Sequence, residues 1–567
     1  MRRKVSDILL VSLLGAMLLF SCRLAPARQS PTKKPPTEKP PTPIVIPPIT
    51  PAVTGVVTGV PSERDTITVI SDSAVIPGAC DSLQALELTN TTLEAAEVIL
   101  PGWSSPMLDF QSAGEQVVVD TTFCRVAGVI TPAIHFEVWM PLTSGQNTWN
   151  GRFVGIGNGG LAGTIRYPDL NEYMMKGFAT ASTDTGHQGD SWDGTWMLHN
   201  PDIWADFAYR SIHMTTLAAK AVLQAFYGDA PRYSYFVGCS DGGYQALMEA
   251  QRYPTDYDGI VAGNPGNYPT RSCAGEVYRS YLTNRSPENV IPKEKLPAIQ
   301  QAALNACDAD DGLADSVIGD PLRCDFDPAT MLCRGADSPD CLTAGEVDTL
   351  QKVYAGLYDP TTGVQFWPGL EPGGELFWTL KSGFLSGNVF GPALAYFQYI
   401  LFENTPNWDW RTFDFTNPKD FAIITEGERL YGPVLDANSP DLSAFRASGG
   451  KLLLYHGWSD QMNSPRHTIN YYESVEAFMG GAANTQDFFR LFMVPGMIHC
   501  GPGTDGLRIV NMLQAVTKWV EQGRAPDTMV SSGDNGMKRL LCPYPQVAIY
   551  KGSGDTNRLE SYRCVNP

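Results

Sequence analysis

The sequence is poor in positive charge. Among its 567 residues, 41 lysines and arginines stand against 60 aspartates and glutamates, which gives a net charge of −19. A nucleic-acid partner requires a concentrated basic surface that binds phosphates. Because the globular part of the chain holds no basic stripe, we expect no nucleic-acid partner.

Two other patterns are missing. No two cysteines have the CxxC spacing, so a structural zinc site has little support. After the N-terminal segment, the sequence shows neither an internal repeat nor an apolar run long enough to cross a membrane. What is present is a globular composition, because an apolar content of 43% can supply a large core.

The first 22 residues have the features of an export signal. Basic residues at positions 2–4 precede an apolar run over residues 8–20, which is too short and too early for a spanning helix. The run ends in "LFSC", which resembles the processing box of bacterial lipoproteins. We therefore expect Cys22 to be lipidated and to anchor the protein at the cell envelope, with an ordinary secretory signal as the alternative.

Residues 23–74 are rich in proline and threonine, as in "PTKKPPTEKPPTPIVIPPITP". Such a composition favours extended conformations and cannot bury a core, so we expect a tether. The rest of the chain exceeds the length that one core usually fills, which predicts a core domain with a large insertion. Export also changes how the cysteines after Cys22 are interpreted, because an oxidising compartment favours disulfides.

Short apolar runs alternate with helix-like stretches along most of the chain. Six of these runs end in a glycine-rich or polar turn, for example "GRFVGIGNGG", "YSYFVGCSDGG" and "GGKLLLYHGWSD". This alternation predicts an α/β fold with a mostly parallel sheet whose functional groups collect at the carboxyl ends of its strands. The pattern breaks down over residues 267–438, which we interpret as an inserted lid between two parts of a catalytic domain, residues 75–266 and 439–567.

A nucleophile motif lies within these runs. The stretch "GCSDG" fits the G-x-S-x-G nucleophile elbow, with an apolar run before it and an amphipathic stretch after it. A serine nucleophile needs a base and an orienting acid. Ser240, Asp460 and His499 occur in the order that this fold uses, so we predict that they form a catalytic triad.

Two cysteines sharpen this prediction. Cys239 precedes Ser240, and Cys500 follows His499. A disulfide between these cysteines would hold the nucleophile and base loops a few ångström apart, because bridged Cα atoms lie about 5.5 Å from each other.

These motifs, together with "YHGWSD", "VPGMIHC" and the C-terminal "LCPYPQVAIYKGSGD", resemble the tannase and feruloyl esterase family, which includes mono(2-hydroxyethyl) terephthalate hydrolase. The resemblance covers residues 80–564 and implies an α/β-hydrolase fold with a lid. It also implies five disulfides: Cys80 with Cys124, Cys239 with Cys500, Cys307 with Cys324, Cys333 with Cys341, and Cys542 with Cys564. Cys273 is left without a partner, which is a departure from the family pattern.

The same resemblance assigns the oxyanion hole. This site needs two backbone N–H groups aimed at developing negative charge. One would come from Asp241, directly after the nucleophile. The other would come from Gly160 in the turn "GNGG", for which a plain tight turn is the alternative.

An acidic stretch, "CDADDGLADSVIGD", lies in the expected lid. Its Asp308, Asp311 and Asp315 carboxylates suit a hard cation such as calcium, although the loop is not an EF-hand because it lacks the terminal glutamate. By the resemblance, the backbone carbonyls of Leu313 and Val317 complete a structural calcium site. A solvated acidic loop is the alternative, and we expect no organic cofactor.

The function expected from these residues is hydrolysis of esters of small aromatic acids through an acyl-enzyme. The lid aromatics Trp367, Phe377, Trp378 and Phe384 could stack on the acyl group or could form the core of the lid. A binding lipoprotein without turnover and a serine peptidase are the alternatives. The intact triad argues against the first, and the resemblance argues against the second.

One feature bears on the substrate. In the terephthalate-monoester hydrolase of this family, a lid arginine binds the free carboxylate of the substrate, a task that suits a planar guanidinium. This chain has no arginine between Arg334 and Arg411, and Lys381 is the nearest substitute. We therefore expect neutral phenolic esters to be preferred over the terephthalate monoester.

The remaining histidines are expected to be structural. His456 and His187 lie near the predicted site and could line a pocket or donate to a catalytic residue. The others are His135, His199, His213 and His467.

Overall fold

The structure is a computed structural model that describes residues 65–567, except for 108–115, 144, 146–147, 199–200, 381–383, 387–388 and 404. The expected signal segment 1–22, the lipidation site Cys22 and most of the expected linker lie outside the described residues. The described residues belong to one compact unit, Ala52–Pro567. None of its described helices combines the length and hydropathy that a membrane span requires.

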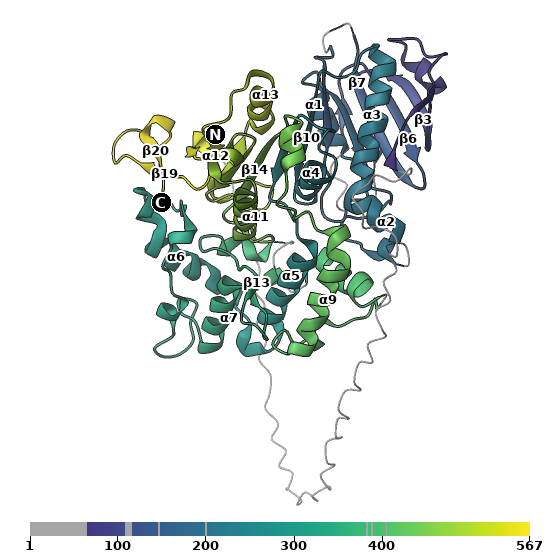
Figure 1. The fold of residues 1–567 in the computed structure, drawn as a ribbon. Helices are drawn as coiled ribbons and strands as arrows, with labels where there is room; N and C mark the ends of the chain where they lie inside the picture. The colour runs from purple at the N-terminus through teal and green to yellow at the C-terminus, as the bar shows by residue number, and fades with distance from the viewer. Residues whose placement is uncertain are drawn as a thin grey trace, which may run out of the picture. The chain divides into compact units, whose positions relative to one another are not determined.

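An 11-stranded sheet forms the centre of this unit (Figure 1). In spatial order its strands are β1 (Val69–Ser71), β2 (Glu87–Leu88), β3 (Thr91–Ile99), β6 (Phe123–Ile130), β7 (Ile134–Pro141), β9 (Ala179–Thr183), β8 (Arg152–Ile156), β10 (Tyr233–Cys239), β11 (Gly259–Gly263), β14 (Lys451–Gly457) and β15 (Phe489–Val494). The strands from β9 to β15 run parallel, as the alternating pattern predicted.

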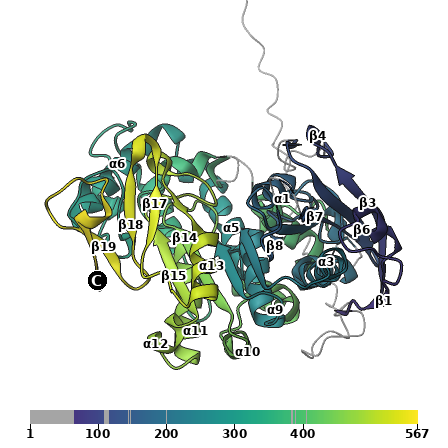
Figure 2. The ribbon, with the colours of Figure 1, turned by 90° about the horizontal axis from the view of Figure 1, so that it is seen from above.

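The sheet is mixed, because the strands from β1 to β7 are antiparallel. Figure 2 shows this part, with β3 and β6, at the far end of the sheet from β15. β6 alternates buried and half-buried residues, which is typical of an antiparallel strand. β1 belongs to the sheet although it lies before residue 75, the boundary expected for the catalytic domain, because it pairs with β2.

Helices cover both faces of the sheet, and alternate residues of the strands serve the two faces. Phe236 and Leu452 pack in a cluster with residues of α3 (Ser211–Tyr227), α4 (Asp241–Arg252) and α11 (Pro465–Phe478). Their neighbours Tyr235 and Leu453 pack in a second cluster with α1 (Tyr167–Met174) and α13 (Met512–Gln522). The period of two therefore produces the three-layer arrangement.

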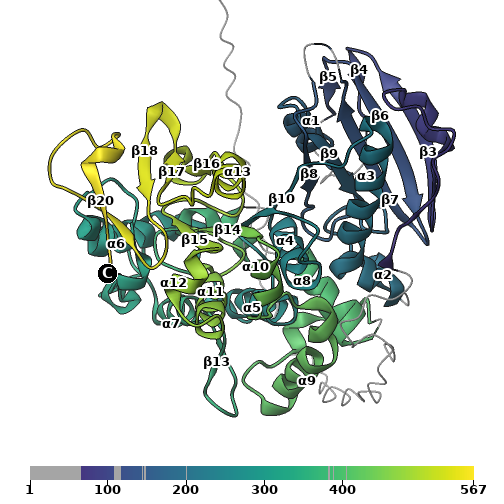
Figure 3. The same cartoon turned by 45° about the horizontal axis from the view of Figure 1, so that its top comes forward.

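The expected lid, residues 267–438, enters between the adjacent parallel strands β11 and β14. Figures 1 and 3 show its helices gathered on one side of the sheet. Its elements are α5 (Pro269–Asn284), α6 (Leu296–Cys307), α7 (Ala344–Ala355), β12 (Leu357–Tyr358), β13 (Gln365–Trp367), α8 (Gly391–Ala395), a π-helical turn η12 (Tyr396–Leu401) and α9 (Pro418–Leu435).

The remaining α-helices and strands are shorter, and 3-10 turns connect many of the elements. These shorter elements are β4 (Trp103–Ser104) paired with β5 (Val118–Val119), α2 (Pro201–Ala205) followed by the π-helical turn η4 (Asp206–Arg210), α10 (Ser443–Ala447), α12 (Ala482–Gln486), a sheet of β16 (Arg508–Val510), β17 (Met529–Ser532) and β18 (Lys538–Leu541), and a hairpin of β19 (Val547–Tyr550) and β20 (Tyr562–Val565).

Candidate active site

Ser240 lies in the sharp turn between β10 and α4. Its φ of +64° and ψ of −119° form a strained conformation that a non-glycine residue rarely adopts. The turn also requires glycine beside it, because a Cβ on Gly238 would lie 2.3 Å from the Gly242 carbonyl oxygen. The motif therefore folds as a nucleophile elbow that presents the serine hydroxyl above the sheet.

Three side chains from separate loops meet at this elbow. His499, which follows β15, has its Nε2 2.8 Å from the Ser240 Oγ. The Nδ1 of the same ring donates to Asp460 Oδ2 at 2.7 Å, and Asp460 follows β14. The predicted residues thus form one hydrogen-bonded chain in which the histidine can accept the serine proton.

Asp460 is fixed on both of its carboxylate oxygens. Oδ1 accepts the backbone N–H groups of Met462 and Asn463 at 2.8 and 2.9 Å. Oδ2 accepts the Asn264 amide at 2.7 Å and lies 3.1 Å from His456 Nε2. Burial would raise the pKa of the Asp460 carboxyl, but the charges and hydrogen bonds of His499 and His456 outweigh it and hold the pKa well below its usual value.

Sequence reasoning did not identify Asn264. It follows β11, has a positive φ of 37°, and lies in the polar turn "DGIVAGNP" that ends one of the six apolar runs, which was its only signal in the sequence. His456 lies beside Asp460, and its Nδ1 is 2.7 Å from Thr468 Oγ1, so the ring is held between the acid and α11. The i,i+4 spacing of His456 and Asp460 at the end of β14 was the only signal of this contact in the sequence.

All five expected disulfides are present. Cys239 and Cys500 are bridged with their Cα atoms 5.9 Å apart, so the bridge joins the residue before the nucleophile to the residue after the base. The other bridges are Cys80–Cys124, Cys307–Cys324, Cys333–Cys341 and Cys542–Cys564. Such bridges are typical of proteins that fold outside the cytosol.

Gly160 and Asp241, the residues predicted to supply the oxyanion-hole amides, both line the cavity at Ser240. Asp241 begins α4, and Gly160 has a φ of +60° with only 2.5 Å between an added Cβ and the Ser191 carbonyl oxygen, so this position requires glycine. Neither amide donates to a backbone carbonyl of the described residues outside regular helices and strands. Burial raises the pKa of the Asp241 carboxyl well above its usual value, which favours the neutral form of this side chain.

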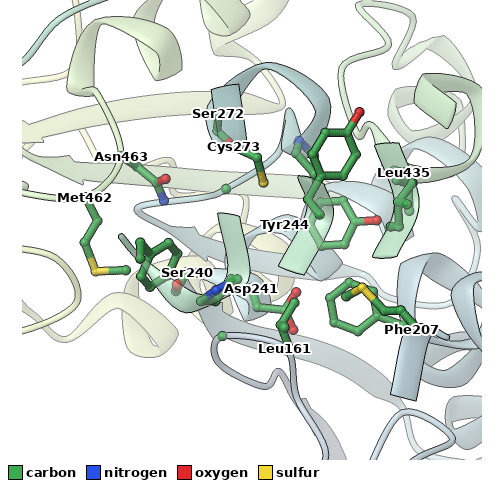
Figure 4. A pocket seen from close by; sticks show the side chains of 18 of the residues that line it. Leu161, Phe207, Ser240, Asp241, Tyr244, Ser272, Cys273, Leu435, Met462 and Asn463 are labelled. Atoms are coloured by element: carbon green, nitrogen blue, oxygen red, sulfur yellow. The ribbon is translucent and has the colours of Figure 1, made fainter. Parts of the chain in front are cut away.

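The cavity at Ser240 is lined by both the core and the lid. Figure 4 shows Ser240 and Asp241 together with Tyr244, Cys273 and Leu435 around it. The aromatic residues of the lining are Trp196, Trp204, Phe207, Tyr244, Phe390 and Tyr396. No lysine or arginine of the described residues is part of the lining.

The lid aromatics that could either stack on the acyl group or form the core of the lid are not part of this lining. Trp378 and Phe384 pack in a separate core of the lid, and Trp367 packs against His467 with ring centroids 4.3 Å apart. Phe377 is half-buried and also lies outside the lining. Aromatic content alone did not show which side chains the lid would bury in its own core. Lys381 lies outside the described residues.

Cys273 contributes its side chain to the cavity. It lies on α5, the first helix of the lid, and is the only free cysteine among the described residues. Burial raises the pKa of its thiol far above the usual value, so the sulfur is a neutral, apolar part of the wall.

In the described acidic loop of the lid, the ligand oxygens of Asp308, Asp311 and Asp315 do not all lie within 4.8 Å of one another. Asp308 accepts backbone N–H groups of Asp315 and Val317, both at 3.2 Å, while Asp315 pairs with Arg539. Burial, helped by the charges of Asp315 and Asp308, raises the pKa of Asp311 to about 7.

The remaining described histidines have structural partners. His187 Nε2 lies 2.8 Å from the Leu161 carbonyl, and the ring stacks on Trp196. His135 pairs with Asp184, His213 with Asp256, and His467 with Asn267. His199 lies outside the described residues.

The elbow, the Ser–His–Asp chain of hydrogen bonds and the parallel strands that carry it define a serine hydrolase of the α/β-hydrolase fold. Comparison with known proteins identifies the family. A family model described as "Tannase and feruloyl esterase" matches residues 116–565. The chain therefore belongs to the tannase and feruloyl esterase family and is a carboxylic ester hydrolase.

Its relatives are bacterial and fungal. An uncharacterized esterase of Xanthomonas campestris pv. campestris is 36% identical over 87% of this chain and 92% of its own length. Feruloyl esterase B of Aspergillus niger is 31% identical over 86% of this chain and 95% of its own. The crystal structure of feruloyl esterase B from Aspergillus oryzae superposes with a TM-score of 0.77 at 31% identity, covering 86% of this chain and 99% of that one.

Proposed function

We propose that this protein is a serine esterase that cleaves esters of small aromatic acids through an acyl-enzyme. The preferred esters carry no free carboxylate on the aromatic ring. The observation that carries the proposal is the hydrogen-bonded chain from Asp460 through His499 to Ser240, which opens onto a cavity walled by aromatic side chains. The names of the fungal relatives, feruloyl esterase B, support an aromatic acyl group.

The first half-reaction transfers the acyl group to the enzyme. His499 Nε2 takes the proton of Ser240 Oγ as this oxygen attacks the ester carbonyl carbon. The amides of Gly160 and Asp241 stabilise the negative charge on the carbonyl oxygen. His499 then gives the proton to the leaving alcohol oxygen, and the carbon–oxygen bond of the ester breaks.

The second half-reaction uses water in the same way. His499 removes a proton from the water, whose oxygen attacks the acyl carbon, and returns the proton to Ser240 Oγ as the acid is released. Asp460 holds the imidazole in the required tautomer throughout and stabilises its transient positive charge.

Serine replacement tests the proposal. The wild type, Ser240→Ala and the control Ser73→Ala, at an exposed position, are assayed on methyl ferulate, methyl gallate and a peptide amide. We expect Ser240→Ala to lose at least a thousandfold in kcat and to keep its melting temperature, with Ser73→Ala unchanged. Turnover by Ser240→Ala within tenfold of wild type contradicts the mechanism. Absence of ester turnover in the wild type favours a binding protein, and faster cleavage of the amide favours a peptidase.

We also propose that the lid binds a structural calcium ion. The carboxylates of Asp308, Asp311 and Asp315 and the carbonyls of Leu313 and Val317 would hold it. Burial is the main cause of the raised pKa of Asp311, and the charges of Asp315 and Asp308 add to it, so a cation held by this loop would offset part of the repulsion. Such an ion would stabilise the loop and take no part in the chemistry.

A further inference from the structure

A buried ion pair on the first lid helix contacts the loop that follows the catalytic acid. Glu276 and Arg279 lie one turn apart on α5 and are only 4% and 2% exposed. The Nη2 group of Arg279 donates to Glu276 Oε1 and also to the backbone carbonyl of Met462. No other described residue donates to this carbonyl. A charged side chain of the lid therefore holds the main chain two residues after Asp460.

The same stretch of main chain orients Asp460. The backbone N–H groups of Met462 and Asn463 both donate to Asp460 Oδ1. Oδ2 of this carboxylate accepts from His499, whose other ring nitrogen faces Ser240. Figure 4 shows Met462 and Asn463 beside Ser240 at the cavity. A shift of the Met462 main chain would therefore move the acid, and with it the base, relative to the nucleophile.

Other parts of the lid hold this loop from neighbouring positions. Ser464 Oγ donates to the Gly369 carbonyl at 2.6 Å. Gly374 packs so closely that a Cβ there would lie 3.0 Å from Ser459 Cα. These contacts fix the two ends of the loop, whereas Arg279 bonds the residue between them whose amide supports the acid.

Stability alone does not explain why a buried ion pair occupies this place. Two buried charges lose their hydration, and an apolar pair of similar volume is often as stable or more stable. The pair also lies within electrostatic reach of the triad. Burial is the main cause that raises the pKa of Glu276 to about 7, while Arg279 lowers it, and the charges of Asp460 and His499 have smaller effects of opposite sign.

We propose that Arg279 is a positioning residue for the reaction, because it fixes the Met462 main chain and thereby the orientation of Asp460 against His499. Glu276 pairs with the guanidinium and keeps it turned towards the Met462 carbonyl. The proposal rests on the proposed esterase function. It adds that the lid orients the catalytic triad besides lining the cavity.

Removal of the whole ion pair from the full-length protein tests this role. Glu276→Met with Arg279→Met leaves no unpaired buried charge, so the melting temperature should stay close to that of wild type. The same change removes the donor to the Met462 carbonyl. We expect kcat for methyl ferulate to fall about tenfold with a smaller change in KM, because small displacements of catalytic groups are costly in rate.

The control removes another buried ion pair of the lid. Lys295→Met with Glu346→Met replaces two side chains that are each 5% exposed and that bond residues of the lid in the described chain. This control should keep the kcat of wild type. Wild-type kcat in the Arg279 double variant overturns the assignment, and so does an equal loss in the control.

The melting temperature separates positioning from a structural role. A drop of several degrees in the Arg279 double variant would show that the ion pair serves the stability of the fold, which also overturns the assignment. An effect confined to KM would place the residue in substrate binding instead and has the same consequence. A wild type that does not hydrolyse methyl ferulate or methyl gallate contradicts the proposed function rather than this role.

Discussion

Cys239 and Cys500 join the nucleophile loop to the base loop across a sequence separation of 261 residues. We expect the double variant Cys239→Ala, Cys500→Ala to lose at least tenfold in kcat with a smaller change in KM, because small displacements of a base from its nucleophile are costly in rate. Steady-state kinetics measure this split. The control is Cys333→Ala with Cys341→Ala, which removes a lid disulfide with a separation of 8 residues. Wild-type kcat in the first variant, or free thiols at both positions in the native protein, would contradict the prediction.

The charge of the substrate should matter strongly. Methyl ferulate is expected to exceed mono(2-hydroxyethyl) terephthalate at least tenfold in kcat/KM, because the described cavity lining holds no cation to pair with a carboxylate. Side-by-side kcat/KM values measure this difference. A preference for the terephthalate monoester would point to a cation outside the described residues, and Lys381→Ala would then show whether Lys381 supplies it.

Stability should decline in mild acid through two buried histidines. Burial lowers the pKa of His467 to about 3 and that of His187 to about 4, against about 6.5 in the unfolded chain. Below pH 6.5 the unfolded state binds protons that the folded state does not. Above this pH the free energy of unfolding is therefore unaffected by the two histidines. As the pH drops towards the folded pKa, it falls by about 1.4 kcal/mol per pH unit for each histidine.

Urea unfolding at pH 7 and pH 4.5 measures this loss. His467→Gln should reduce the difference between the two pH values by about 3 kcal/mol relative to wild type, because glutamine binds no proton. His187→Gln should act in the same direction. Wild-type pH dependence in both variants would show that other groups cause the decline.

Chelation should lower the melting temperature by several degrees without removing a catalytic group, because an ion that binds only the folded lid stabilises it by mass action. Thermal melts with chelator and with added calcium measure the shift. Asp308→Asn should abolish the calcium-dependent shift, whereas Asp310→Asn, an exposed neighbour, should keep it. A shift in neither the wild type nor Asp310→Asn, together with no calcium by elemental analysis, would contradict the site.

Much of the catalytic constellation follows from short patterns. The glycines beside Ser240 require a tight turn, and the cysteines adjacent to Ser240 and His499 impose a distance on residues far apart in the chain. Both are local or covalent constraints, and such constraints can be inferred from neighbouring residues alone. The parallel strands can likewise be predicted from the sequence, because they are continuous apolar runs.

The antiparallel strands, and the residues that support the triad from outside it, could not be predicted from such patterns. Asn264 supports Asp460 only because β11 and β14 are neighbours in the sheet, and nothing in the segment around it indicates this contact. Pairing between strands depends on which segments pack together, a choice made by the whole chain.

The sequence by itself indicated the serine, histidine and aspartate that the structure brings together and the bridge between Cys239 and Cys500, whereas the other disulfide pairs came from the resemblance to the family. Only the tertiary structure decided which side chains line the cavity at Ser240. It buried Trp378 in the core of the lid and brought Tyr244 and Tyr396 together at the cavity. The physical reason is that an aromatic side chain gains about the same free energy in either apolar environment, so its residue type cannot specify which one it enters.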